Sequence, residues 1–379
     1  MTVTEILYLF RTQRHYTYIR ASAIGKTGGR MVEKMDAVVK VKGQEGGTEI
    51  QKVPVPAVGP DDVLIKVDVA SICGTDVHIY EWNGWAQNRI KPPLLYGHEF
   101  AGHIVSVGNN VKNVKKDDYV SGECHIACGT CFNCRTGLMH ICENTKIFGV
   151  DVPGIFAEYA KIPAMNCWKN DPKLKPEWAS IQDPLGNATH SLFRTRVPTR
   201  NVVIFGVGPI GMMQVGIAKL VGAKQVIAIG RKNKFRTDLA KKMGADFAIL
   251  SAETDPVKFV KEHTDGRGAD VVLENAGDAA GVTTCLKMLR QGGELSLLGV
   301  FGENASIDLS KDVVFKYANI YGINGRLMWD TWYRMAGLFR SGLNVDPIIT
   351  HKFPLSEFEK GMAAMRGGNS GKVVLYPGK

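Results

Sequence analysis

Between residues 201 and 298 the chain alternates short apolar runs with segments of helical periodicity, and this alternation constrains the fold more than any other feature. We predict strands at 201–206, 225–229, 247–250, 271–274 and 293–298, and helices at 188–196, 210–221, 234–243, 256–263 and 279–289. Strands that alternate with helices form a parallel, doubly wound sheet. The fold class is therefore α/β in this region.

A glycine-rich hexapeptide, 206–211, joins the first predicted strand to the first helix of this run. Gly206, Gly208 and Gly211 permit a tight turn and close approach of a pyrophosphate, which the helix N-terminus attracts. Alone the motif is weak evidence. Between a strand and a helix it predicts a dinucleotide-binding site.

The residue expected to contact the adenosine ribose lies about 20 positions after the motif and is usually acidic. Gly230 stands there, and Arg231 and Lys232 follow. Without a carboxylate a 2′-phosphate is not repelled, and a guanidinium binds phosphate in a bidentate manner. This favours NADP over NAD. The alternative is that Arg231 is a solvated loop residue on which adenine stacks.

Four cysteines, Cys128, Cys131, Cys134 and Cys142, lie in the Gly-rich segment 121–145, which carries little periodicity. This spacing is typical of a closed, tetrahedral zinc site, and such a segment needs the metal to fold. The alternative, a set of ordinary buried thiols, explains the spacing poorly. We expect a structural zinc here.

A second group of metal-binding residue types lies upstream: Cys73 ends an apolar strand, and His98 and Glu99 are adjacent. Thiolate, imidazole and carboxylate together suit a zinc with a free position for substrate, whose hydroxyl pKa the metal lowers. Thr75 and His78 follow Cys73 and are candidates to carry the released proton to solvent. A lone histidine is usually structural, but this constellation favours catalysis.

Composition limits the other classes of function. The 379 residues suggest two or more domains, and no apolar run reaches 18 residues, so we expect no membrane span. The net charge is 47 − 37 = +10, of which residues 1–30 supply +4, and the rest is dispersed. This distribution makes a nucleic-acid partner unlikely on charge alone. Eight cysteines without a secretory signal indicate a reducing, cytoplasmic compartment.

Residues 1–30 are basic and carry no motif, so we expect a disordered, dispensable extension, with a transit peptide as the alternative. Residues 35–120 consist of short strands, such as 63–69 and 102–107, broken by Gly, Pro and Asp. They predict a small β-barrel. A closing strand is expected at 371–376.

With these motifs the chain resembles the zinc-containing medium-chain dehydrogenase family across 31–379. The most specific matching segments begin at Ser71, Trp85, Asn144, Asp183, Gly325 and Asp346. The resemblance implies a GroES-like catalytic domain at 31–186 and 326–379, a Rossmann domain at 187–325, and a homotetramer. It further implies two zinc ions per chain and a small-molecule substrate, without nucleic-acid or membrane partners.

The resemblance also assigns residues. It makes Cys73, His98 and Glu99 the catalytic-zinc group, with Asp183 as a ligand or a support of the relay formed by Thr75 and His78. His125 matches a histidine that affects substrate choice. Further cofactor contacts implied by the match are Ile210, Arg236, Leu298, Gly299, Val300, Gly322 and Ile323. Two positions depart from the family pattern: Gly230 replaces an acid, and Cys124 replaces a glycine.

The activity implied is oxidation of the secondary hydroxyl of L-threonine to 2-amino-3-ketobutyrate, with hydride transfer to NAD(P). Arg326 and the segment 329–333 are compatible with an amino-acid pocket. The close alternative is a polyol or secondary-alcohol dehydrogenase, acting on sorbitol or 2,3-butanediol. A non-enzymatic, crystallin-like relative is a different class, but such relatives tend to lack the zinc ligands.

Overall fold

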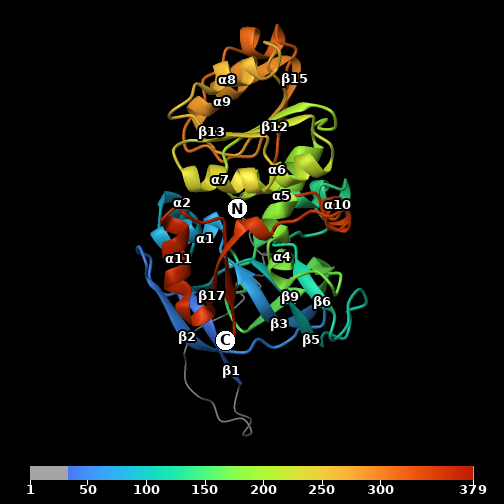
Figure 1. Cartoon of the computed structure of the whole chain (residues 1–379). Helices are drawn as coiled ribbons and strands as arrows, with labels where there is room; N and C mark the ends of the chain where they lie inside the picture. The colour runs from blue at the N-terminus through green and yellow to red at the C-terminus, as the bar shows by residue number, and fades with distance from the viewer. Residues whose placement is uncertain (1–32, 379) are drawn as a thin grey trace, which may run out of the picture. The chain divides into compact units, whose positions relative to one another are not determined.

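The computed structural model describes residues 33–378. The predicted extension at 1–30 therefore lies outside the described residues. Two sheet systems dominate the rest of the chain: an antiparallel one built mainly from its first half and its last strands, and a parallel one built from the middle. Figure 1 shows both.

The middle of the chain forms a six-stranded parallel sheet with strand order β13-β12-β11-β14-β15-β16. Its strands are β11 (Asn201–Phe205), β12 (Gln225–Gly230), β13 (Phe247–Leu250), β14 (Ala269–Glu274), β15 (Leu289–Leu297) and β16 (Asn319–Gly322). Its connecting helices are α6 (Pro209–Leu220), α7 (Lys234–Lys242), α8 (Pro256–Glu262) and α9 (Ala279–Met288). The prediction of a doubly wound parallel sheet is confirmed.

Three elements differ from the sequence prediction, and one of them is β16, where no strand was predicted. The helix expected at 188–196 is α5, which spans Gln182–Phe193. It begins earlier because Pro184 lies in its first turn, where the missing N–H removes no helical hydrogen bond. Strand β15 begins at Leu289 instead of 293, directly after α9. Gly292 and Gly293 suggest a break there, but the strand continues through them.

The antiparallel system contains a seven-stranded sheet with the path β10-β6-β5-β3-β18-β17, and β9 pairs with β3. Its strands are β3 (Asp62–Ser71), β5 (Glu99–Val107), β6 (Tyr119–Gly122), β9 (Tyr159–Pro163), β10 (Cys167–Lys169), β17 (Ile349–Pro354) and β18 (Lys372–Tyr376). A second sheet joins β2 (Thr48–Pro54), β1 (Lys34–Lys40) and β4 (Leu94–Leu95), and β7 (His125–Ile126) pairs with β8 (Lys146–Ile147). The predicted short strands and closing strand are confirmed.

The remaining helices connect these strands along the chain. They are α1 (Gly74–Glu81), α2 (Gly84–Arg89), α3 (Phe132–Arg135), α4 (Pro176–Ser180), α10 (Asp330–Arg340) and α11 (Phe358–Arg366). Single-turn elements are η1 (Met139–Ile141), η2 (Ala164–Asn166), η4 (Asp346–Ile348) and η5 (Leu355–Glu357), and η3 (Leu309–Val314) is a π-helical turn. Within residues 33–378, no helix has both the length and the apolar character needed to cross a membrane.

Each sheet system buries its own core. Val202 and Ile204 of β11 belong to one apolar cluster and Val203 to another, because alternate side chains of a strand point to opposite faces. Trp332 and Met335 of α10 share the cluster of Val202. The segment after 325 thus packs partly with the parallel sheet, and the domain boundaries stay predictions.

Candidate active site

Cys73, His98 and Glu99 lie together, with one potential ligand atom of each within 4.8 Å of the others. The strand pairing explains why. In the antiparallel pair β3–β5, Ser71 at the end of β3 is opposite Glu99 at the start of β5. Cys73, the N-cap of α1, comes two residues after Ser71, and His98 directly precedes β5. His98 and Glu99 are 5% and 1% exposed.

Glu99 is held on one side by buried groups. Its Oε2 accepts from the Ser71 hydroxyl and from the ammonium of Lys372, the first residue of β18. Lys372 also donates to the Ile72 carbonyl at 2.9 Å. The second oxygen, Oε1, is buried without a hydrogen-bond partner among the described residues. A buried carboxylate oxygen without a donor is an available ligand atom.

The surroundings of His98 are anionic. Asp76 accepts a 2.8 Å hydrogen bond from the Cys73 backbone N–H, and its other oxygen lies 3.7 Å from His98 Nδ1. Burial raises the pKa of Asp76 to about 6. Burial alone would lower the pKa of His98, but the charges of Asp76 and Cys73 raise it well above its usual value. A pocket that favours positive charge this strongly fits a metal cation, and the thiolate–imidazole–carboxylate set fits zinc.

Thr75 and His78 occupy one face of α1, three residues apart. The Thr75 hydroxyl is 3.8 Å from Cys73 Sγ. His78 is exposed, and the side-chain amide of Asn83 donates to its Nδ1 at 2.9 Å. A hydroxyl beside the buried group and an imidazole at the surface suit proton transfer between the two environments.

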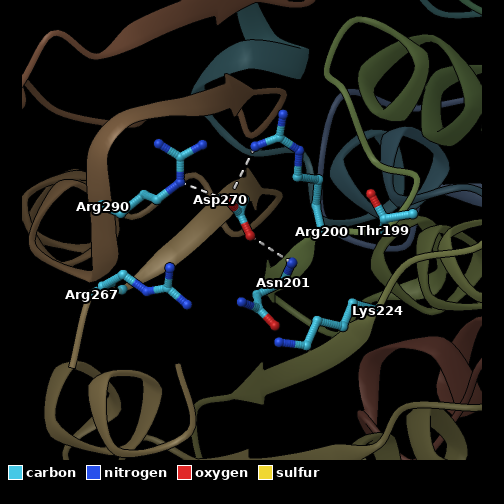
Figure 2. A pocket seen from close by; sticks show the side chains of 8 residues that line it. Thr199, Arg200, Asn201, Lys224, Arg267, Asp270 and Arg290 are labelled. Atoms are coloured by element: carbon cyan, nitrogen blue, oxygen red, sulfur yellow. Dashed lines mark hydrogen bonds and ion pairs between the residues drawn. The ribbon is translucent and has the colours of Figure 1, made fainter. Parts of the chain in front are cut away.

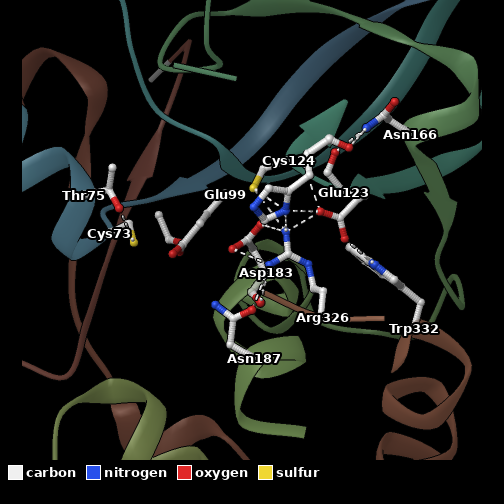
Figure 3. A network of polar contacts seen from close by, with 12 residues as sticks. Cys73, Thr75, Glu99, Glu123, Cys124, Asn166, Asp183, Asn187, Arg326 and Trp332 are labelled. Atoms are coloured by element: carbon white, nitrogen blue, oxygen red, sulfur yellow. Dashed lines mark hydrogen bonds and ion pairs between the residues drawn. The ribbon is translucent and has the colours of Figure 1, made fainter. Parts of the chain in front are cut away.

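A buried charge network adjoins this group (Figure 3). The Arg326 guanidinium is fully buried and binds the Asp183 carboxylate in a bidentate manner, one of the two contacts being 3.0 Å long. It also donates to Glu123 Oε1 at 2.6 Å and to Cys124 Sγ at 3.1 Å. Trp332 donates to the other Glu123 oxygen at 3.0 Å. Arg326 therefore neutralises two buried carboxylates and is not free to bind a substrate carboxylate.

Asp183 is not grouped with the three upstream residues, since its carboxylate faces Arg326. His125 lies in the same network, with Nδ1 2.7 Å from Glu123 Oε1. Burial would raise the pKa of Glu123, but the Arg326 charge and the hydrogen bonds from His125 lower it to about 2. Glu123, Cys124 and His125 can also be drawn as a metal-binding trio. Arg326 already supplies the positive charge there.

The four downstream cysteines also come together. Cys128, Cys131, Cys134 and Cys142 have sulfur–sulfur distances of 3.5, 3.9 and 4.0 Å among the recorded pairs. Tetrahedral zinc with Zn–S bonds of 2.3 Å requires about 3.8 Å between sulfurs. Hydrogen bonds from Thr130 and from the Cys131 N–H lower the pKa of Cys128 to about 5, which favours the thiolate. None of the eight cysteines forms a disulfide in the structure.

The glycine-rich turn has the geometry that its sequence predicts. Gly206 has φ +97°, and a Cβ there would lie 2.8 Å from the Ala276 nitrogen. A Cβ on Gly211 would lie 2.0 Å from the Gly206 carbonyl oxygen, so the helix could not pack as closely on the strand. Nothing lies within 4 Å of the same position on Gly208, which leaves open space beside the N-terminus of α6. This space suits a pyrophosphate.

The end of β12 is tightly packed. A Cβ on Gly230 would lie 2.9 Å from methyl groups of Thr237 and Val207. Arg231 and Lys232 are exposed, and the Arg231 carbonyl accepts from the Ala252 N–H at 3.0 Å. Arg236 in α7 is half-buried, and its Nε has no hydrogen-bond partner within residues 33–378. Three basic residues therefore lie at or near the carboxyl end of β12.

The other predicted cofactor contacts follow β15 and β16. Leu298, Gly299 and Val300 come directly after β15, and the Leu298 N–H donates to the Glu274 carbonyl at 3.0 Å. Gly322 ends β16, and the Ile323 N–H donates to Leu297 at 2.9 Å. Ile210 lies in the first turn of α6. Because the strands are parallel, these segments share the carboxyl edge of the sheet with Gly206.

Sequence reasoning missed several residues that shape the site. Asp76 has a recognisable signal, since it falls three residues after Cys73 on the same helix face. Ser71 and Lys372 have none, because each interacts with Glu99 across the sheet. Glu123 also has no sequence signal, because its spacing from the neighbouring residues matches no metal-binding or catalytic motif. It acts through its pairing with Arg326, 203 residues away in sequence.

Comparisons with known proteins agree with this architecture. Residues 59–173 match the alcohol dehydrogenase GroES-like domain, and residues 209–341 match the zinc-binding dehydrogenase domain. The chain belongs to the zinc-binding alcohol dehydrogenase family, and the predicted fold class is confirmed.

Individual members of this family that are similar to the chain include enzymes named for one substrate. An L-threonine 3-dehydrogenase from Caldanaerobacter subterraneus subsp. tengcongensis is 51% identical over 90% of this chain and 99% of the relative. Another, from Thermococcus kodakarensis, is 48% identical over 92% of this chain and 100% of the relative. A zinc-binding dehydrogenase from Sinorhizobium meliloti, solved with NADP, superimposes with a TM-score of 0.83 at 29% identity, covering 91% and 100% of the two chains.

Proposed function

We propose that this chain oxidises the secondary hydroxyl of L-threonine, yielding 2-amino-3-ketobutyrate, with transfer of the hydride to a nicotinamide dinucleotide. The observation that carries the proposal is the buried group Cys73, His98 and Glu99, with a free carboxylate oxygen in an anionic pocket. The substrate assignment is supported by relatives named L-threonine 3-dehydrogenase at 48% and 51% identity over nine-tenths of the chain.

Zinc bound by these three residues would supply a Lewis acid that lowers the pKa of the substrate hydroxyl. The protein supplies the rest. Asp76 lies 3.7 Å from His98 Nδ1, so among the described residues it acts on the ring through its charge and not through a hydrogen bond. Lys372 and Ser71 fix one oxygen of Glu99 and leave the other for the ligand site.

We propose that the proton released from the hydroxyl moves by way of Thr75 to His78 and then to solvent. The contact of Thr75 with Cys73 and the exposure of His78 support this route. The hydride leaves the carbon that bears the hydroxyl and moves to the nicotinamide. One proton and one hydride are therefore removed for each carbonyl formed. The bidentate contact to Arg326 favours a supporting role for Asp183 over direct coordination.

Replacing Cys73 with Ser tests the reactive zinc. We expect turnover to fall below detection and zinc content to fall from about two to one per chain, with unchanged dinucleotide affinity, because the nucleotide turn lies on another sheet. Cys167→Ala, which removes a buried thiol outside all three of the cysteine-containing groups, is the control. Full turnover in Cys73→Ser would contradict the proposal.

The substrate is tested by assaying purified protein with L-threonine, sorbitol and 2,3-butanediol, each with NAD and with NADP. We expect the highest kcat/KM for L-threonine. A higher value for sorbitol or 2,3-butanediol would replace the threonine assignment with the polyol or secondary-alcohol alternative and leave the zinc chemistry intact.

For the cofactor we propose NADP over NAD. Gly230 offers no carboxylate to the ribose, and Arg231, Lys232 and Arg236 supply positive charge nearby. A charge-assisted hydrogen bond contributes about 1.5–3 kcal/mol, so we expect kcat/KM to favour NADP at least about tenfold. Arg231→Ala should remove most of this preference, and Lys241→Ala at the far end of α7 should not.

Gly230→Asp is a less direct test of this preference, because any side chain at position 230 collides with Thr237 and Val207. Equal or better use of NAD by the unaltered protein would show that the loop geometry, not the missing acid, sets the preference.

A further inference from the structure

A cavity of about 310 Å³ lies at the amino-terminal ends of β11 and β14. Its lining comes from the residues that precede these strands and from Lys224 before β12 and Arg290 in β15. Figure 2 shows Arg267 and Lys224 reaching toward each other from opposite sides, with Asn201 between them. The nucleotide turn at Gly206 lies at the other end of β11, so the cavity is separate from the dinucleotide site.

The charge of this cavity is unbalanced. Arg200, Lys224, Arg267 and Arg290 line it together with one carboxylate, Asp270, so its net charge is 4 − 1 = +3. Like charges around one cavity repel one another. An anion between them would lower this repulsion and so stabilise the folded protein.

Asp270 is already used by the fold. It accepts from Arg290 Nε at 2.6 Å, from Arg200 Nη1 at 3.3 Å and from the Asn201 backbone N–H at 2.8 Å. These bonds lower its pKa although burial opposes them. Asp270 therefore fixes two arginines at the cavity wall, and both of its oxygens already accept hydrogen bonds.

Lys224 and Arg267 are the available cations. Within residues 33–378, Lys224 forms no ion pair, and Arg267 pairs only with Asp265, an exposed residue outside the cavity lining. The Thr199 hydroxyl and the Asn201 side-chain amide also line the cavity and add neutral donors.

We propose that this cavity is a second anion site, which binds phosphoryl groups: inorganic pyrophosphate or the phosphates of a free nucleotide. Guanidinium groups bind phosphoryl oxygens in a bidentate manner, and lysine adds a point charge. The cavity is large enough for two phosphoryl groups. A bound anion links the segments that precede three strands of the parallel sheet, so it stabilises the folded protein without competing with the dinucleotide.

Inorganic pyrophosphate is the probe. Binding is measured by calorimetry and by thermal shift on the full chain, with saturating NADP present and with chloride matched for ionic strength. We expect saturable binding and a rise in Tm that NADP does not abolish. ADP as a second probe distinguishes the sources of the phosphoryl groups, since binding stronger than that of pyrophosphate indicates a nucleotide.

The double variant Lys224→Gln, Arg267→Gln should weaken pyrophosphate binding at least about tenfold and leave dehydrogenase activity unchanged. The matched control, Lys360→Gln with Arg334→Gln, removes one exposed lysine and one exposed arginine that do not line the cavity. Pyrophosphate should also protect Lys224 from acetylation in the unaltered protein, a readout that needs no variant.

Three results would overturn the inference: stabilisation no greater than with chloride, loss of the effect when NADP is bound, or equal weakening in both double variants. The second result would assign the anion to the glycine-rich turn. Because dehydrogenase turnover is measured separately, an inactive enzyme that still binds pyrophosphate would leave this inference standing and count only against the proposed activity.

Discussion

At the residue scale, Arg326 is the charged side chain at the site that pairs with two buried carboxylates. It is buried with Glu123 and Asp183, and a charge triad of this kind is stable only when all members are present. The three residues come from separate parts of the chain and meet beside the reactive group. Arg326 holds Asp183 and Glu123 by ion pairs, and its Nη2 lies 3.4 Å from His125 Nδ1.

Replacing Arg326 with Met should lower the free energy of unfolding by about 3–5 kcal/mol, because two carboxylates lose their buried partner. Arg326→Lys should recover part of this loss, since the charge remains and the bidentate fork does not. Urea denaturation measures both values. Arg334→Met, at an exposed arginine paired with Asp330, is the control and should change stability by less than about 1 kcal/mol.

Side-chain chemistry and spacing were enough to predict most of the ligand types. Cys128, Cys131, Cys134 and Cys142 are near neighbours in sequence, so their convergence follows from local turns. The partners of Glu99 could not be predicted in this way. Lys372 is a single lysine at the start of an apolar strand, and only the pairing of β18 with β3 brings it to Glu99.

At the scale of elements, we expect the cysteine-rich lobe to depend on metal more than on packing. Its segment has only short elements, α3, η1, β7 and β8, and a small apolar cluster formed largely by the cysteines themselves. We therefore predict that metal binding and folding are coupled in this lobe.

Cys131→Ser should remove about one zinc per chain and lower Tm, because a closed site loses one of its four ligands. At a temperature where the variant remains folded, turnover per molecule should persist. The metal content and a thermal melt check this, with Cys167→Ala as the control. A variant of unchanged Tm that had lost turnover would mean that this metal takes part in the reaction.

Helix α4 is attached to the last strands through Glu177. Its carboxylate accepts from Lys352 of β17 at 2.5 Å and from the Tyr376 hydroxyl of β18 at 2.7 Å. Burial opposes ionisation, but these two hydrogen bonds lower the pKa of Glu177 to about 2, from an ordinary value of 4.5. The carboxylate therefore stabilises the folded state above pH 4.5, and this contribution is lost as the pH falls toward 2.

Glu177→Gln should remove this contribution. Above pH 5 the variant should be less stable than the unaltered protein by about 1 kcal/mol, and the difference should shrink as the pH falls from 4.5 toward 2. Denaturation at several pH values gives the difference in stability between the two proteins directly. Acid effects on the metal sites are common to both proteins and cancel in this difference. A difference that is constant over this range would contradict the assignment.

At the scale of the whole molecule, the expected homotetramer stays a prediction. Its physical basis is β16, an edge of the parallel sheet, with large exposed apolar side chains close by in sequence. Val314, Phe315 and Tyr317 are 66%, 78% and 81% exposed. An open strand edge beside exposed apolar side chains is typical of an interface between subunits.

Light scattering should therefore give a mass about four times 41.5 kDa. Phe315→Glu should yield a smaller species, because it introduces a charge beside the strand edge. Ile50→Glu, at an exposed apolar residue of β2, should not. A monomer in the unaltered protein would refute the assembly prediction.

The parallel architecture of the sheet was predictable at this scale, and the packing of α10 was not. Alternating strands and helices predict the parallel sheet, since each βα unit has a local signal. The contacts of Trp332 and Met335 with the Val202 cluster depend on the path of the chain after β16, for which the sequence offers no comparable signal.

The pairing of Lys372 with Glu99 has a consequence for biosynthesis. The two residues are 273 positions apart, so the ribosome adds a further 273 residues after Glu99 before its counter-ion exists. Until β18 pairs with β3, burial of Glu99 is unfavourable, and the reactive pocket remains unformed in every nascent chain. We therefore expect a metal to be bound at Cys73, His98 and Glu99 only after β18 has been made, and shortened chains that lack β18 should not retain it.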